Sequence, residues 1–152
     1  MMNVILYLRF SKNQYIDVTL ERYGMRQCKA VKSPLAFGPV LPTGSKLLSD
    51  EAAWYRSLIG SLLCISTFTR PDGSFAVSFL SRFIAEPKHQ HLIAAKRILR
   101  NLKGIFKHGL VFNGSSNVPN ILQGYSDSDW GNDYNNRSTS GYVFTMSGGR
   151  GQ

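Results

Sequence analysis

Apolar residues recur with the spacing of an α-helix in the first part of the chain. Ile16, Leu20 and Tyr23 stand at positions i, i+4 and i+7, and Gly24 follows them. Residues with this spacing lie on one face of a helix, and glycine readily ends a helix. The pattern therefore predicts a short helix over residues 14–23.

A second helix is predicted to begin at Asp50. Ser49 or Asp50 can cap its N-terminus, and Glu51 suits the positive end of the helix dipole. The Arg-Pro-Asp-Gly sequence at residues 70–73 ends it. Its broad apolar face, which we expect to pack in the core, consists of Tyr55, Leu58, Ile59, Leu62 and Leu63.

Two more helices are predicted over residues 74–83 and 89–103. Pro87 separates them, and Gly104 ends the second. Residues 32–46 contain three prolines and two glycines with little periodicity, which favours a surface loop. The residues of the first of these two helices that we expect to point mostly inward are Phe75, Val77, Phe79 and Leu80.

After Gly104 the hydrophobic period shortens to that of β-strands. Strands are predicted over residues 109–112, 121–129 and 141–146, and Asn113-Gly114 is a strong turn signal. Helices followed by strands are typical of an α+β fold. The change of period predicts a domain boundary near residues 114–120.

Positive charge is concentrated on the last predicted helix. The chain has 18 Lys and Arg against nine Asp and Glu, a formal net charge of +9, and residues 87–126 contain no acid. Lys96, Arg100 and Lys103 fall in a stripe of about 60°, next to Arg97. The separate apolar stripe of this helix consists of Leu92, Ala95, Leu99 and Leu102.

A cationic helix face of this kind can follow a phosphate backbone without reading base sequence. The pattern therefore favours sequence-independent binding of an RNA or DNA duplex through Lys96, Arg97, Arg100 and Lys103. A basic face that is merely solvated is the other interpretation of the same charges.

The cysteines and histidines indicate neither a disulfide framework nor a metal centre. Cys28 and Cys64 are too few for either, and two reduced thiols are expected. His89, His91 and His108 lack the Cys or carboxylate partners of a metal site, so we expect all three at the surface.

No membrane segment is predicted. The longest interior uncharged run, residues 57–69, is broken by Ser, Gly and Thr, and a span needs roughly 20 mostly apolar residues. Residues 1–8 lack the basic region and the cleavage site of a signal peptide. We therefore expect an intracellular protein, in the cytoplasm or nucleus, with no membrane partner.

Several longer motifs follow one another along the chain. They are Tyr-Arg-Ser-Leu-Ile-Gly-Ser-Leu-Leu at 55–63, Thr-Arg-Pro-Asp at 69–72, Phe-Ala-Val-Ser-Phe-Leu-Ser-Arg-Phe at 75–83, Ala-Ala-Lys-Arg-Ile-Leu-Arg-Asn-Leu-Lys-Gly at 94–104, Gly-Tyr-Ser-Asp-Ser-Asp-Trp at 124–130 and Arg-Ser-Thr-Ser-Gly-Tyr-Val-Phe at 137–144. In this order the motifs resemble the region after the polymerase palm in copia-type LTR retrotransposon Pol polyproteins, and the resemblance runs from about residue 12 to residue 149.

The resemblance implies two segments. Residues 1–113 would be the C-terminal, thumb-like and mainly helical part of a reverse transcriptase, which grips a primer–template duplex. Residues 114–152 would be the start of a ribonuclease H-like domain, with its first hairpin strands. Asp127 would then correspond to the first metal-binding aspartate of that nuclease, whose family uses Mg²⁺.

The residues needed for catalysis are not all in this chain. The Tyr-x-Asp-Asp turn of the polymerase is absent, since no two Asp residues are adjacent. Asp127, Asp129 and Asp133 are the only acids after Glu86, and they lie too close together to surround two metal ions. We therefore expect Asp127 to be a vestigial catalytic residue in an incomplete metal site, the isolated chain to be no enzyme, and no cofactor to be held.

Two hypotheses follow from these observations. In the first, the chain is a non-catalytic fragment of a Pol polyprotein that contacts primer–template nucleic acid through its basic helix. In the second, it is a freestanding, non-enzymatic nucleic-acid-binding module derived from such an element.

Overall fold

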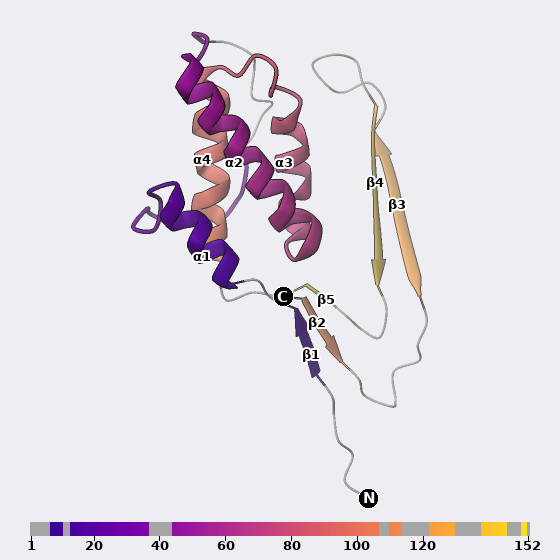
Figure 1. The fold of residues 1–152 in the computed structure, drawn as a ribbon. Helices are drawn as coiled ribbons and strands as arrows, with labels where there is room; N and C mark the ends of the chain where they lie inside the picture. Colours follow the sequence, from indigo (N-terminus) through magenta and orange to yellow (C-terminus); the bar gives the residue numbers. More distant parts are fainter. Residues whose placement is uncertain are drawn as a thin grey trace, which may run out of the picture. The chain divides into compact units, whose positions relative to one another are not determined.

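The protein has an α+β fold that divides into two compact units. The structure, a computed structural model, describes residues 7–10, 13–36, 44–106, 110–113, 122–129, 138–145 and 150–151. One unit, Lys12–Lys107, is helical, and the other joins Met1–Ser11 to His108–Gln152 and contains the strands (Figure 1). The boundaries between the two units lie after residues 11 and 107. The boundary after residue 113, where the resemblance places the end of the polymerase segment and the start of the nuclease segment, stays a prediction.

Four helices make up the described part of the helical unit. The α2 and α4 helices each contact the three other helices (Figure 1). Among the described residues, no helix combines the length and the apolar composition that a membrane span requires. The elements are α1 (Asn13–Arg22), α2 (Ser49–Phe68), the 3-10 turn η1 (Pro71–Gly73), α3 (Ser74–Ser81) and α4 (His89–Gly104).

The core of this unit lies between the apolar stripes that the sequence pattern predicts. Tyr55 is completely buried, and its hydroxyl donates a hydrogen bond of 2.7 Å to the carbonyl of Leu80. Burial raises the pKa of Tyr55 well above its usual range, so the phenol stays a neutral donor. The buried residues on the predicted faces also include Ile16, Leu20, Tyr23, Leu58, Ile59, Leu62, Val77, Leu92, Ala95, Leu99 and Leu102.

Three expectations about these helices were wrong. Leu63 does not pack in the core, since it lies on the exposed side of α2 with 38% of its surface exposed. The N-cap of α2 is Leu48, rather than Ser49 or Asp50, because the carboxylate of Glu51 accepts the backbone N–H of Leu48 at 3.4 Å. Phe75 does not point inward, since 63% of its surface is exposed at the start of α3.

The loop predicted over residues 32–46 is described only at its two ends. Residues 32 and 33 lie along α4, as shown below, and the backbone near Lys46 pairs with that near Lys88. The middle of this loop, like His108 and the predicted boundary at 114–120, lies outside the described residues.

The strand unit contains two antiparallel sheets. The β1 (Tyr7–Phe10), β2 (Leu110–Asn113) and β5 (Arg150–Gly151) strands form one sheet in the order β1-β2-β5. The β3 (Gln123–Asp129) and β4 (Thr139–Thr145) strands form the other. The predicted strands at 109–112, 121–129 and 141–146 are thus confirmed within a residue or two at each described end, whereas β1 and β5 were not expected.

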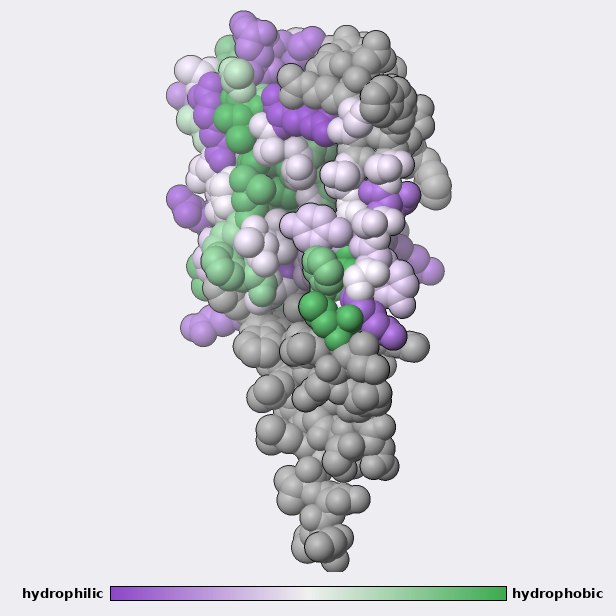
Figure 2. Space-filling model, turned by 90° about the vertical axis from the view of Figure 1, so that its right-hand side faces the viewer, coloured by the Kyte–Doolittle hydropathy of each residue, from purple (hydrophilic) through white to green (hydrophobic). Residues whose placement is uncertain are grey.

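The β3–β4 ribbon exposes apolar side chains on both faces. The register pairs Gly124 with Phe144 on one face and Tyr125 with Val143 on the other. Each of these three large side chains is at least 59% exposed, and Figure 2 shows a molecular surface on which hydrophobic residues reach the solvent between hydrophilic ones. The Phe144 ring lies across Gly124, where an added Cβ would meet it at 2.8 Å.

His91 is a core residue, which corrects its predicted surface position. Its ring is fully buried and stacks on Phe83 with the ring centroids 4.0 Å apart. Nδ1 accepts the backbone N–H of Lys88 at 3.1 Å, and Nε2 is buried without a hydrogen-bond partner among the described residues. His89, in contrast, is exposed as expected.

We predict that His91 makes the protein less stable in mild acid. Burial first, and then the charge of Lys88, lower the pKa of His91 below its ordinary value of 6.5. As the pH falls below that ordinary value, the unfolded chain takes up a proton that the folded chain resists, so the free energy of unfolding decreases. Urea unfolding at about pH 7 and about pH 5 measures this loss.

The His91→Asn variant keeps an acceptor for Lys88 but does not titrate. Its free energy of unfolding should change less over this pH range than that of the wild type. An equal change in both proteins would contradict the assignment to His91.

Candidate nucleic-acid interface

Three of the four predicted nucleic-acid-binding residues contact a segment of the same unit that belongs to no helix or strand. We call residues 28–33 the strap. Lys103 Nζ donates to the carbonyl of Cys28 at 2.7 Å, and Arg100 Nε donates to that of Lys29 at 2.8 Å. Arg97 Nη2 lies 3.3 Å from the hydroxyl of Ser33. The strap therefore runs along α4 in the opposite chain direction, and these cationic side chains hold it.

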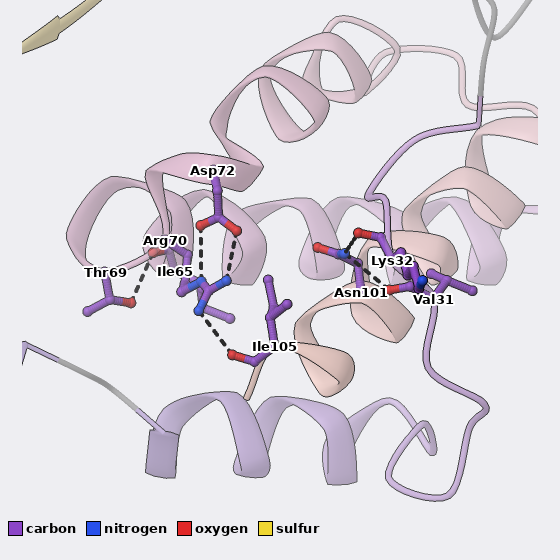
Figure 3. Close-up of polar contacts among 8 residues, drawn as sticks. All are labelled: Val31, Lys32, Ile65, Thr69, Arg70, Asp72, Asn101 and Ile105. Carbon is purple, nitrogen blue, oxygen red and sulfur yellow. Dashed lines mark hydrogen bonds and ion pairs between the residues drawn. The ribbon is translucent and has the colours of Figure 1, made fainter. Parts of the chain in front are cut away.

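Asn101 anchors the middle of the strap. Its side-chain amide donates to the carbonyls of Val31 and Lys32 at 3.2 and 2.9 Å (Figure 3). The Val31 N–H returns a bond of 3.3 Å to the carbonyl of Arg100. Gly104 permits this close approach, since a Cβ there would lie 3.3 Å from the Ala30 Cβ.

The sequence carried a signal for Asn101 that the predicted site did not use. Asn101 follows Ala94 and Ile98 at helical spacing, so it is a polar residue on an apolar face. In the structure it is 3% exposed, and a buried amide needs partners, which the strap carbonyls supply.

Lys96 differs from the other three basic residues because it does not touch the strap. It is exposed, and its ammonium lies 5.4 Å from the centroid of the Trp54 ring on α2. This is the range of a cation–π contact. Arg97, Arg100 and Lys103 are half-buried.

In the described part of the chain, no carboxylate forms an ion pair with the basic residues of this face. Within the described residues, the ion pairs join Arg26 to Asp17 and Glu21, Lys46 to Glu86, and Arg70 to Asp72, and none involves Lys96, Arg97, Arg100 or Lys103. A carbonyl is a dipole without net charge, so the strap accepts hydrogen bonds and leaves the cationic field in place.

The Arg-Pro-Asp motif has a structural role in this unit. The side chain of Arg70 is 7% exposed and donates to both carboxylate oxygens of Asp72, at 3.1 and 2.7 Å. It also donates to the carbonyl of Ile105, just beyond α4, at 3.1 Å (Figure 3). One guanidinium thus ties the turn after α2 to the end of α4.

We predict that Arg70→Ala destabilises the helical unit by about 2 to 3 kcal/mol, because charged hydrogen bonds are lost and the Ile105 carbonyl loses its donor. The figure is modest because the carboxylate partner, Asp72, is half exposed. Urea unfolding followed by circular dichroism measures it. Arg22→Ala, which removes an exposed arginine, should cost no more than about 0.5 kcal/mol; an equal loss in both variants would contradict the role of Arg70.

Asp127 lies on β3, directly opposite Gly141 of β4. Its carboxylate is exposed, and Oδ1 accepts the backbone N–H of Ser128 at 2.9 Å. Asp129 is the last residue of this strand, and Asp133 lies outside the described residues. No group of three or more His, Cys, Asp or Glu side chains that could hold a metal ion occurs in the described parts of the chain.

The cysteines are free, as expected, and both are half-buried. Cys28 contributes its backbone carbonyl to the contact with Lys103, and Cys64 lies on α2. The contact of Cys28 with α4 is thus made by its backbone and not by its thiol.

Comparison with known proteins shows what these features belong to. The chain is 40% identical over 149 residues to the retrovirus-related Pol polyprotein from transposon TNT 1-94 of Nicotiana tabacum, a match that covers 93% of this chain and 11% of that protein. It is 39% identical over 137 residues to that from transposon RE1 of Arabidopsis thaliana, covering 90% of this chain and 9% of the relative. The chain is thus homologous to copia-type retrotransposon Pol polyproteins and spans about a tenth of their length.

A shorter relative also matches. Over 96 residues, 62% of this chain, the chain is 42% identical to secreted RxLR effector protein 161 of Plasmopara viticola, of which the match covers 66%. No family model matches the chain, and no solved structure does. The resemblance that the motifs indicated is therefore confirmed at the level of the family.

Proposed function

We propose that this chain is a non-catalytic segment of a Pol polyprotein that contacts nucleic acid through the basic face of α4. The observation that carries the proposal is the absence of carboxylate partners for Lys96, Arg97, Arg100 and Lys103 among the described residues. The intended partner is an RNA or DNA duplex bound without regard to sequence.

The distribution of charge between the two units supports this proposal. Fifteen of the 18 Lys and Arg residues lie in Lys12–Lys107, together with six of the nine acids, so this unit carries the whole net charge of +9. The remaining three basic and three acidic residues balance one another. A field concentrated on one unit attracts a polyanion to that unit rather than to the molecule as a whole.

In this proposal the helical unit corresponds to the thumb-like part of a reverse transcriptase. The β3–β4 ribbon corresponds to the first strands of a ribonuclease H-like domain, in which Asp127 would be the first metal-binding aspartate. The motifs carried by α2, α3, α4 and the ribbon support both assignments.

The chemistry of Asp127 supports a non-catalytic role. Mg²⁺ holds its water ligands tightly and binds where several oxygen ligands meet. Two-metal hydrolysis of a nucleic acid requires still more carboxylates around the pair of ions. A single exposed carboxylate that already accepts an N–H from Ser128 meets neither requirement. We therefore propose that the chain holds no cofactor and is not an enzyme by itself, and that it acts inside the cell.

A freestanding binding module is the second candidate function. The observation that favours it is the match to RxLR effector protein 161, of which this region covers 66%. A related segment thus makes up most of a shorter protein. Genomic context distinguishes the candidates: in-frame or frameshifted palm sequence upstream favours the polyprotein segment, and an intact gene under purifying selection favours the module.

We predict that replacing Lys96, Arg97, Arg100 and Lys103 with Ala weakens the binding of a fluorescein-labelled DNA duplex, measured by fluorescence anisotropy. Wild-type affinity should fall steeply with salt, with a slope of about −0.9 in log–log form for each phosphate neutralised. The slope of the variant should be shallower because fewer phosphates are contacted.

The control variant removes the same charge from other segments of the unit: Arg22, Lys46, Arg56 and Arg82 become Ala. It should retain most of the affinity. An equal loss in both variants would show that only net charge matters, and wild-type binding that does not respond to salt would refute the phosphate contacts.

We predict that neither the wild type nor Asp127→Asn extends a primer or cleaves the RNA of an RNA–DNA hybrid in Mg²⁺. The two proteins should also unfold at nearly the same urea concentration, because Asp127 is exposed and its contact is local. Hybrid cleavage by the wild type that the variant lacks would overturn the non-catalytic assignment.

A further inference from the structure

The strap satisfies the cations of α4 with the kind of atom that a phosphate backbone would supply. Its carbonyl oxygens at Cys28 and Lys29 accept from Lys103 and Arg100, at 2.7 and 2.8 Å. The Ser33 hydroxyl accepts a hydrogen bond from Arg97 Nη2. The Nε atom of Arg97 is buried without a hydrogen-bond partner among the described residues. Oxygen atoms of the strap thus occupy donors that the proposed function assigns to nucleic acid.

We propose that the strap and the phosphate backbone of a nucleic acid compete for Arg97, Arg100 and Lys103, so that binding requires the strap to leave α4. The proposal rests on the proposed function of this face and adds its regulation. Lys96 takes no part in the competition, because it lies over Trp54 and does not touch the strap.

Phosphate oxygens carry negative charge and the carbonyl oxygens of the strap do not, so the cations of α4 favour phosphate in this competition. Hydrogen bonds from Arg or Lys to an anionic oxygen are shorter and stronger than those to a neutral carbonyl. Phosphate contacts also release condensed counterions, which favours the exchange at low salt. The contacts of Asn101 to Val31 and Lys32 oppose it, because a neutral amide gains nothing comparable from a phosphate.

A substitution of Asn101 therefore tests the docking of the strap without changing the charge of the face. Asn101→Ala removes two anchors of the strap and leaves every cation in place. If docking competes with binding, the variant should bind a DNA duplex more tightly, on the order of tenfold, because a larger fraction of the molecules has a free face. Trypsin should also cleave faster after Lys29 and Lys32.

A disulfide across the strap gives the opposite change. The Ala30 Cβ lies 3.3 Å from the Cβ position of Gly104, close to the separation of about 3.5 to 4.5 Å in disulfides. We would introduce Ala30→Cys and Gly104→Cys in full-length protein carrying Cys28→Ser and Cys64→Ser, so that one pairing is possible. Cys28→Ser keeps the backbone carbonyl that Lys103 uses.

The experiment compares the oxidised and reduced forms of this protein by anisotropy with the labelled duplex over a range of salt. The oxidised form should bind on the order of tenfold more weakly, and its salt slope should be smaller by about two to three, since three cations are withheld. The reduced form is the matched control, and the parent without Ala30→Cys and Gly104→Cys should not respond to the reductant.

The outcomes separate the competition from the proposed function. Equal affinity of the two forms, with the four-alanine variant still weakened, would refute the competition and leave the nucleic-acid face standing. Weaker or unchanged binding by a folded Asn101→Ala would also refute it. If neither the wild type nor any variant binds, the proposed function fails, and the competition fails with it.

Discussion

The hydrogen bonds between α4 and the strap determine what the basic residues of this protein can do. A segment outside helices and strands lacks their regular hydrogen bonds, so its carbonyls must find donors elsewhere or face water. Arg100, Asn101 and Lys103 supply those donors from the last turn of one helix. The face of α4 that the charge pattern assigns to nucleic acid is therefore also the face that binds the strap.

The other side of α4 explains why this helix can carry both duties. Its apolar stripe, with Leu99 fully buried, fixes the helix against α2 and α3. The guanidinium of Arg70 then closes the far end by joining Asp72 to the carbonyl of Ile105. Because α4 is held by its core face and at its C-terminus, it can lose its contacts with the strap and stay in the helical unit. An exchange of the strap for nucleic acid requires this.

In the strand unit, large apolar side chains of the β3–β4 ribbon are exposed. The two strands of the β3–β4 ribbon pair along seven residues, yet Tyr125 and Val143 on one face and Phe144 on the other remain exposed. Two paired strands are marginally stable in water without further strands or a helix to cover them. The chain spans about a tenth of the Pol polyproteins to which it is related. Asp127 lies on the same ribbon and is exposed.

The local elements and the relationship to Pol polyproteins could be predicted from the order of residues alone. Helical spacing located all four helices and most of their buried residues, because a pattern of period 3.6 depends only on neighbours along the chain. Alternation and turn residues located β2, β3 and β4 in the same way. The ordered motifs indicated the copia-type relationship, which identity over most of the chain confirms.

The partners of these elements are visible only in the folded chain. There β1 lies beside β2, a hundred residues further along the chain. His91 is buried against Phe83, and Arg100 and Lys103, which the charge pattern assigned to the surface, donate to the strap together with Asn101. The physical reason is the same in each case: burial and hydrogen bonding depend on atoms that are distant in sequence, and a local pattern of polarity contains no information about them.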